Sequence, residues 1–179
     1  MCRAGCNRKE TLNHISQGCP LTHQRRIARH NAVSNYIKRG LENRGYTVFD
    51  EPIYKTSVGN RKPDLVALKN KTAFVIDSQI VGESVGLKRA NQRKISYCKD
   101  NDEMIDEIRR LHKVDEVSVL AATLNLRGCW SSRSVDDLIT KNRMLTQNDL
   151  TVRSTRVLIG TYSAFTLFNK STWRAGVGA

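Results

Sequence analysis

Hydrophobic residues recur along the first half of the chain with two different periods. Between residues 22 and 43 the apolar side chains return every three or four positions, which is typical of a helix with one buried face, and Gly45 follows as a stop. Three short apolar segments then predict strands at residues 46–49, 63–68 and 72–81. A polar turn at residues 69–71 joins the last two strands into a hairpin.

The second half predicts further helices around one more strand. Helices are expected at residues 85–99, 103–112 and about 150–169, and an apolar strand buried on both faces at 116–122. Asp102 is the expected cap of the 103–112 helix. Two capping boxes, Ser134 with Asp137 and Thr146 with Asp149, each predict the start of a helix. The sum is an α/β domain with a small mixed sheet flanked by helices.

Length and composition fit one compact domain with a small appendage. The chain has 179 residues, of which 39% are hydrophobic and 26% charged, so general disorder is excluded. No apolar run approaches the ~20 residues of a membrane helix, and the first residues lack the apolar segment of a secretory signal. We therefore expect a reducing compartment and no membrane partner. The seam near Pro20 divides a small module, residues 1–21, from a domain at residues 22–179.

The net charge of +13 favours a polyanionic partner. Thirty Lys and Arg oppose seventeen Asp and Glu, and the first 45 residues hold nine basic residues against two acidic ones. Such a basic surface attracts nucleic acid through a term that does not depend on sequence. Nucleic acid is therefore the leading partner class.

Three cysteines and one histidine near the N-terminus predict a zinc site. Cys2, Cys6, His14 and Cys19 form the pattern C-x3-C-x7-H-x4-C, which suits a closed tetrahedral Zn²⁺ site. So short a segment has almost no apolar core, and a bound metal would supply most of its folding free energy. His23 is an alternative fourth ligand. The two remaining cysteines, Cys98 and Cys129, are expected to be bystander thiols.

Two aspartates are expected to meet at one end of the predicted hairpin. Lys62-Pro63-Asp64 opens the second strand, and Asp77 lies near the end of the third. Two convergent carboxylates suit a hard cation such as Mg²⁺ or Mn²⁺, which keeps coordination positions for water and phosphate oxygens during phosphodiester hydrolysis. Glu51 is a weaker candidate for a further carboxylate.

A lysine could complete this site from the following helix. Gln79 follows Asp77 on the same strand face, at the step where many metal-dependent nucleases carry a lysine. One helix face is expected to hold Leu87, Ala90, Lys94 and Tyr97. From there Lys94 could orient or deprotonate an attacking water, although a lysine at a helix rim also commonly extends to solvent. Lys88 and Lys99 are the alternatives.

The first long helix carries a basic cluster that could hold phosphates near the cleft. Its members are Arg25, Arg26, Arg29 and His30. For His30 alone, a hydrogen-bonded structural role is equally consistent with the sequence.

Together these residues resemble a known family. The cysteine and histidine knuckle, the run from Arg26 to Asn31, Lys62-Pro63-Asp64, Asp77 and Lys94 are similar in order and spacing to the restriction-like endonuclease domain of site-specific non-LTR retrotransposons. This domain is of the PD-(D/E)xK type and follows a CCHC zinc knuckle. The resemblance covers residues 2 to about 100.

The resemblance implies a Mg²⁺- or Mn²⁺-dependent DNA endonuclease. In that family a nick in double-stranded target DNA releases a 3′-hydroxyl, which primes reverse transcription by another part of the same polyprotein. By position, Asp64 and Asp77 would hold the metal, and Lys94 would be the catalytic lysine. The knuckle, the basic helix and Lys62 would grip nucleic acid. Gln79 departs from the general nuclease pattern.

The same resemblance implies the partners and the compartment. The expected partners are target DNA and the reverse transcriptase and RNA portions of the same ribonucleoprotein, and the expected localisation is nuclear. A knuckle that begins at residue 2 predicts that the chain was cut from a longer protein.

Two other readings stay open at the level of sequence. One is a catalytically inactive nuclease fold that binds nucleic acid or protein, as in the nuclease-like domain of the large spliceosomal scaffold protein. The other is a zinc-knuckle RNA chaperone, which leaves the α/β core unexplained.

Overall fold

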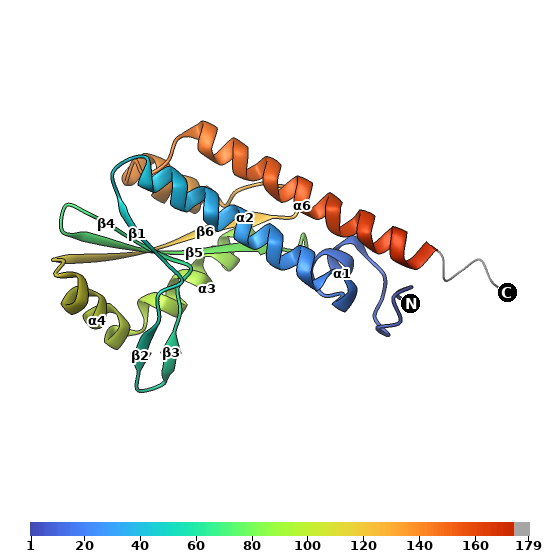
Figure 1. Cartoon of the computed structure of the whole chain (residues 1–179), viewed down its shortest axis with the longest axis horizontal. Helices are drawn as coiled ribbons and strands as arrows, with labels where there is room; N and C mark the ends of the chain where they lie inside the picture. The colour runs from blue at the N-terminus through green and yellow to red at the C-terminus, as the bar shows by residue number, and fades with distance from the viewer. Residues whose placement is uncertain (174–179) are drawn as a thin grey trace.

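A mixed four-stranded sheet forms the centre of the protein (Figure 1). The computed structural model describes residues 1–173. The strands, in their order across the sheet, are β1 (Thr47–Asp50), β4 (Leu65–Lys69), β5 (Thr72–Val81) and β6 (Glu116–Asn125). The first three are antiparallel neighbours, and β6 runs parallel to β5. The fold class predicted from the sequence, α/β with a small mixed sheet, is confirmed.

Helices cover both faces of this sheet. In Figure 1, α2 (His23–Glu42) and α6 (Gln147–Trp173) lie on one side, and α3 (Leu87–Lys99) and α4 (Asp102–His112) lie on the other. The side chains of β5 point alternately to the two faces of the sheet. Ile76 joins the core under α2 and α6, whereas Val75 joins the core under α3 and α4. The central strands are therefore buried on both faces, which explains their nearly continuous apolar sequence.

A small hairpin that the sequence analysis did not predict projects from the body of the fold. It consists of β2 (Tyr54–Thr56) and β3 (Gly59–Arg61), which pair antiparallel and extend away from the main sheet in Figure 1. At the base of the hairpin, Tyr54 is buried in the same apolar core as Val75, under α3 and α4. At the turn, Gly59 adopts a positive φ of 107°. Three-residue strands are too short to show a period-two pattern.

The N-terminal segment packs on the end of the last helix. It contains α1 (Leu12–Gln17) and a 3₁₀ turn, η1 (Pro20–Thr22), just before α2. Phe168 of α6 is fully buried against Ile15, Cys2 and Cys19. The apolar surface of this segment therefore continues into the long helix.

The predicted helix starts were partly wrong. Asp102 is the first residue of α4, and its cap is Asn101, whose Oδ1 accepts the amide of Met104 at 2.8 Å. Ser134 does not open a helix either, because its hydroxyl is turned inward, where it donates to the Ala121 carbonyl at 2.6 Å.

The actual helix in this region is α5 (Ser132–Val135), followed by a π-helical turn, η2 (Asp136–Lys141). The capping box of Thr146 and Asp149 is confirmed, since each side chain accepts the amide of the other residue. Within residues 1–173, no helix combines the length and the apolar character that a bilayer crossing requires.

Candidate active site

Asp64 and Asp77 lie side by side where β4 begins. Leu65 pairs with Ile76 in the antiparallel ladder, which places Asp64 opposite Asp77. The amide of Asp64 donates to Oδ1 of Asp77 at 3.0 Å, and the amide of Ser78 donates to Oδ2 of Asp64 at 2.7 Å. The register of the two strands therefore orients each carboxylate through a backbone amide of the opposite strand.

Two further groups contact Asp77, which is only 3% exposed. The Sγ of Cys98 donates to its Oδ2 at 3.1 Å, and the Nζ of Lys94 lies 3.3 Å from the same oxygen. Burial, together with the Asp77 charge, raises the pKa of Cys98 to about 12, so its thiol is a proton donor here. The buried carboxylate is thus compensated by one ammonium and two hydrogen bonds. No sequence pattern signalled the contact made by Cys98.

Lys94 reaches Asp77 from the border of the buried face of α3. That face consists of Ala90, Asn91, Ile95 and Cys98, and Tyr97, which was expected on it, is 57% exposed. The predicted face was therefore displaced around the helix. Lys88 and Lys99, the alternatives to Lys94, are exposed.

Gln79 has a bridging role in the sheet. Its Nε2 donates to the carbonyl of Ala90 at 2.9 Å and to the Oγ1 of Thr123 at 2.8 Å. The side-chain amide of Gln79 thus links β5 to α3 and β6. Many metal-dependent nucleases carry their lysine at this strand position.

His30 of α2 faces Asp64 from the opposite side. Its Nε2 lies 3.2 Å from Oδ2 of Asp64 and 3.1 Å from the carbonyl oxygen of Ser78. The hydrogen bond with Asp64 raises the pKa of His30. Burial alone would raise the pKa of Asp64, but His30 and the Ser78 amide outweigh it, so the pKa of Asp64 is lowered. Oδ2 of Asp64 and the carbonyl oxygen of Ser78 therefore form a position that stabilises positive charge.

An open cleft of about 330 Å³ lies between α2 and this pair. Its lining residues are His30, Asn31, Ser34, Asn35, Asp50, Glu51 and Asp64. Glu51, the weak candidate from the sequence, enters the cleft because its backbone has a positive φ of 47° and its amide donates to the Asp64 carbonyl at 2.8 Å. Lys62 pairs with the Glu51 carboxylate. Three carboxylates therefore line the cleft, and each has a basic partner, since Lys38 also pairs with Asp50 and His30 with Asp64.

The basic residues of α2 divide into exposed and internal ones. Arg25 is exposed, and Arg26 bonds to the carbonyl of Gln17. Arg29, which was expected to contact phosphates, is only 2% exposed and donates to Oε1 of Gln17 at 3.1 Å and to Oγ1 of Thr161 at 3.0 Å. Burial lowers the pKa of Arg29 to about 10. In this structure Arg29 joins α1, α2 and α6, and its guanidinium does not face solvent.

The four predicted zinc ligands form one compact cluster. The ligand atoms of Cys2, Cys6, His14 and Cys19 all lie within 4.8 Å of one another. The Sγ atoms of Cys2 and Cys19 are 4.0 Å apart, and Sγ of Cys6 is 3.0 Å from Nε2 of His14. A tetrahedral Zn²⁺ with bonds of about 2.0–2.3 Å separates its ligand atoms by about 3.5–3.8 Å. The donor set therefore fits zinc, and the alternative ligand His23 is not part of the cluster.

The segment that carries this cluster also contacts the sheet and α6. Nη2 of Arg3 donates to Oδ1 of Asn169 at 3.0 Å, and its guanidinium lies 5.3 Å from the centre of the Phe168 ring. Nε2 of Gln17 donates to the carbonyl of Ile80 at 2.7 Å, three residues beyond Asp77 on β5. The segment is thereby tied to the same strand end as the candidate site.

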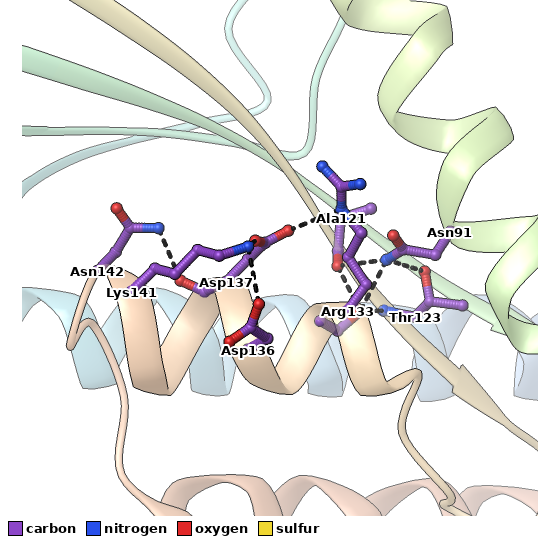
Figure 2. A network of polar contacts seen from close by, with 9 residues as sticks. Asn91, Ala121, Thr123, Arg133, Asp136, Asp137, Lys141 and Asn142 are labelled. Carbon is purple, nitrogen blue, oxygen red and sulfur yellow. Dashed lines mark hydrogen bonds and ion pairs between the residues drawn. The ribbon is translucent and has the colours of Figure 1, made fainter.

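A buried polar network fixes α3 on the other side of the sheet (Figure 2). Nδ2 of Asn91 donates to the Ala121 carbonyl at 3.0 Å and to Oγ of Ser134 at 2.8 Å. Beside it, Asp137 pairs with Arg133 and Lys141. Because Asn91 lies one turn before Lys94, this network sets the position from which the lysine reaches Asp77.

Comparison with known proteins finds retrotransposon relatives along nearly the whole chain. The "Retrovirus-related Pol polyprotein from type-2 retrotransposable element R2DM" of Drosophila melanogaster is 44% identical over 167 residues, 93% of this chain and 16% of that protein. The "Retrovirus-related Pol polyprotein from type-1 retrotransposable element R2" of Nasonia vitripennis is 35% identical over 176 residues, 97% of this chain and 17% of that protein. A protein with the same description in Popillia japonica is 37% identical over 153 residues, 83% of this chain and 31% of that protein.

These relatives support a retrotransposon origin for the chain, which spans about one sixth of the length of the first two. No protein-family model matches the sequence. A crystal structure of a protein described as of unknown function superposes on 82% of this chain with a TM-score of 0.36 and 8% identity, which is too weak to inform the fold.

Proposed function

We propose that the chain is the DNA endonuclease part of a non-LTR retrotransposon polyprotein. It would nick target DNA with Mg²⁺ or Mn²⁺ and leave a 3′-hydroxyl for target-primed reverse transcription. In this proposal residues 1–21 are the zinc knuckle, and residues 22–179 are a restriction-like endonuclease domain of the PD-(D/E)xK type. The observation that carries it is the cross-braced pair of Asp64 and Asp77, with the ammonium of Lys94 3.3 Å from Asp77.

The oxygen atoms at this site fit a hard divalent cation. The carboxylates of Asp64 and Asp77 and the carbonyl of Ser78 are the kinds of ligand that Mg²⁺ and Mn²⁺ take in proteins. His30 contacts two of these groups, Oδ2 of Asp64 at 3.2 Å and the Ser78 carbonyl at 3.1 Å, and its hydrogen bond with Asp64 raises its pKa. When bound there, the cation would polarise the scissile phosphate and lower the pKa of an attacking water.

The other catalytic roles would be filled by side chains that are already positioned at the site. Lys94, about one third exposed, can donate from its ammonium to the attacking water or to a phosphate oxygen that gains charge in the transition state. His30 holds the Asp64 carboxylate, and Cys98 holds that of Asp77, so neither acid needs to reorganise. Preorganisation of this kind lowers the barrier because no energy is spent on orienting the groups during the reaction.

The remaining expectations from the sequence enter the proposal as its partners. The Cys2, Cys6, His14 and Cys19 cluster would hold a structural Zn²⁺. Double-stranded target DNA is the substrate, with Arg25, Arg26, His30 and Lys62 as contacts. The reverse transcriptase and RNA portions of the same polyprotein would use the released 3′-hydroxyl, and the site of action would be nuclear.

A plasmid-nicking assay tests this function. Supercoiled plasmid is incubated with the purified chain and Mg²⁺ or Mn²⁺ at low salt, and the open circular product is measured. We expect nicking by the wild type, and its loss in Asp64→Asn, in Asp77→Asn and on addition of a chelator. Asp106→Asn is the matched control, because that acid is exposed on α4. Full activity of both site variants would reject the proposal.

One observation favours a second candidate, a nuclease fold that only binds nucleic acid or protein. Both oxygens of Asp77 are already engaged by groups of the chain itself, the Asp64 amide, the Cys98 thiol and the Lys94 ammonium. A wild-type chain that binds DNA in a salt-dependent, metal-independent manner and never nicks it would favour this candidate.

A further inference from the structure

Cationic side chains gather on the α3 side of the candidate site. A hollow of about 500 Å³ lies there between the end of β5 and α3, lined in part by Gln79, Arg93, Lys94 and Tyr97. A second hollow of about 620 Å³ lies between α3 and the β2–β3 hairpin, lined in part by Val58, Arg61, Arg89, Arg93 and Tyr97. Because both include Arg93 and Tyr97, they join into one surface, which we call the arginine groove, defined by Arg61, Arg89, Arg93 and Tyr97.

The lining of this groove differs in charge from that of the cleft on the α2 side. The α2 cleft is lined by Asp50, Glu51 and Asp64, and its only ionisable nitrogen is His30. The lining of the two joined hollows contains four cationic side chains and a single acid, Asp100. The candidate metal position therefore lies between a cleft whose carboxylates are each paired with a basic group and a groove in which cations outnumber acids.

The helix arginines of the groove are free of acidic partners. Within residues 1–173, neither Arg89 nor Arg93 lies within 4.0 Å of a carboxylate, and both side chains are exposed. By contrast, Lys62 is paired with Glu51 and Arg127 with Glu83. Unpaired exposed guanidinium groups in a hollow are available for phosphate, which they bind in a bidentate, charge-assisted manner.

Arg61 is held in the groove by an aromatic ring. Its guanidinium lies 4.8 Å from the centre of the Tyr97 ring, and its Nη1 donates to the Tyr97 hydroxyl at 3.1 Å. The stack fixes the third cation opposite α3 and spans the gap between the hairpin and the helix. Arg89 and Arg93 are one turn apart on α3, so all three cations face the same hollow.

We propose that the arginine groove binds the phosphate backbone of duplex DNA and leads it across Lys94 to the paired aspartates. This inference rests on the proposed endonuclease function and names the side from which the substrate reaches the site. Lys94 lines the hollow between β5 and α3. A DNA backbone in the groove would therefore pass close to Lys94 and to Asp77, which Lys94 contacts. Contacts to phosphates carry no sequence information, and the groove would supply affinity and position but not target choice.

Equilibrium DNA binding tests the groove without any cutting. Fluorescence anisotropy of two labelled duplexes of unrelated sequence is measured over a range of salt concentrations in the presence of a chelator. The proteins are the wild type, Arg89→Ala, Arg93→Ala and the matched control Arg39→Ala, another exposed helix arginine on α2. Circular dichroism verifies that each variant is folded.

We expect both groove variants to bind both duplexes more weakly. The slope of log Kd against log salt should fall by about 0.9 for each phosphate contact that is lost. Arg39→Ala should bind like the wild type, and Arg93→Lys, which keeps the charge without the fork, should lie between wild type and Arg93→Ala. Unchanged affinity and slope in Arg89→Ala and Arg93→Ala, or an equal loss in Arg39→Ala, would overturn the groove.

The nicking assay separates this inference from the function on which it rests. A wild type that never nicks, together with groove variants that lose DNA affinity, would remove the endonuclease proposal and leave the groove as a DNA site. If the wild type nicks DNA and the groove variants bind DNA like the wild type, only the proposed role of the groove is rejected. Variants that lose affinity for duplex RNA but keep it for DNA would overturn the choice of ligand.

Discussion

The backbone amide of Asp64 donates to the side chain of Asp77 across the β4–β5 pair, at 3.0 Å. The return bond, from the Ser78 amide to the Asp64 carboxylate at 2.7 Å, makes the brace reciprocal. A shift of one residue in strand register would send one of these acids to the opposite face of the sheet. The candidate site is therefore a property of the hairpin register as much as of the two acids.

The first prediction concerns which lysine serves the site. Lys94→Ala should lower the nicking rate by about 100-fold or more, because a positioned cation beside the reacting phosphate contributes on that scale. Lys88→Ala and Lys99→Ala, on the same helix but away from Asp77, should nick at nearly the wild-type rate. The measurement is the initial rate of open-circle formation at saturating protein. A 100-fold loss in either control, with Lys94→Ala active, would reassign the lysine.

The second prediction concerns zinc. Elemental analysis should find one zinc per chain in the wild type and none in Cys6→Ser, whereas Cys129→Ser, which changes an exposed thiol, should keep the metal. Because Cys2 and Cys19 pack on Phe168 of α6, loss of zinc should also destabilise the main domain. In a domain of this size each kcal/mol lost lowers the melting temperature by about 2–4 °C. A Cys6→Ser variant that melts like the wild type would show that the segment is independent of the core.

Parts of this arrangement were accessible from sequence because they depend on local spacing. The helix of residues 22–43, the hairpin that brings Asp64 to Asp77, and the cysteine and histidine cluster all follow from residues close together in the chain. The predicted range 72–81 coincides with β5, and the ranges 22–43 and 63–68 differ from α2 and β4 by one or two residues at their ends.

What the sequence could not show depends on distant contacts. Arg29 was expected to be free for phosphate, but Thr161, 132 residues away, covers it once α6 packs on α2. The same holds for Cys98, whose role follows from the packing of α3 on β5, 21 residues from Asp77. The β2–β3 hairpin is too short for a periodic signal in the sequence. Because the hairpin forms one side of the arginine groove, the sequence did not predict the groove either. Tertiary packing decides which cations remain accessible.

The third prediction tests the network that holds α3. Asn91 is fully buried, and Asn91→Ala would remove its donors to the Ala121 carbonyl and to Ser134. The free energy of unfolding should fall by about 1–3 kcal/mol, because buried groups lose their partners. Gln92→Ala, at the exposed neighbouring position, should change it by less than about 0.5 kcal/mol. Urea denaturation measures both, and equal midpoints for the two variants would argue against the network.

The fourth prediction concerns pH and the start of α6. Oδ2 of Asp149 accepts the amide and the hydroxyl of Thr146, both at 2.8 Å, and pairs with Arg44 at 2.6 Å. Burial opposes ionisation, but these bonds outweigh it and lower the pKa of Asp149 below its ordinary 3.8. A lowered pKa in the folded state means that the ionised acid stabilises the fold above pH 3.8, and that this contribution disappears as the pH falls through the folded-state pKa.

Asp149→Asn should therefore lower the free energy of unfolding by about 1–2 kcal/mol at pH 6, the scale of a lost helix cap with its ion pair. The difference between wild type and variant should shrink as the pH falls below 3.8, because the acid of the unfolded wild-type chain then binds a proton that the folded acid still resists, and it should vanish once the pH is below the folded-state pKa. Urea unfolding of both proteins at pH 6 and pH 3 gives this difference directly, and it cancels the effect of other titrating groups. A difference of the same size at both pH values would mean that the shape of the capping box, and not the charge of Asp149, stabilises the start of α6.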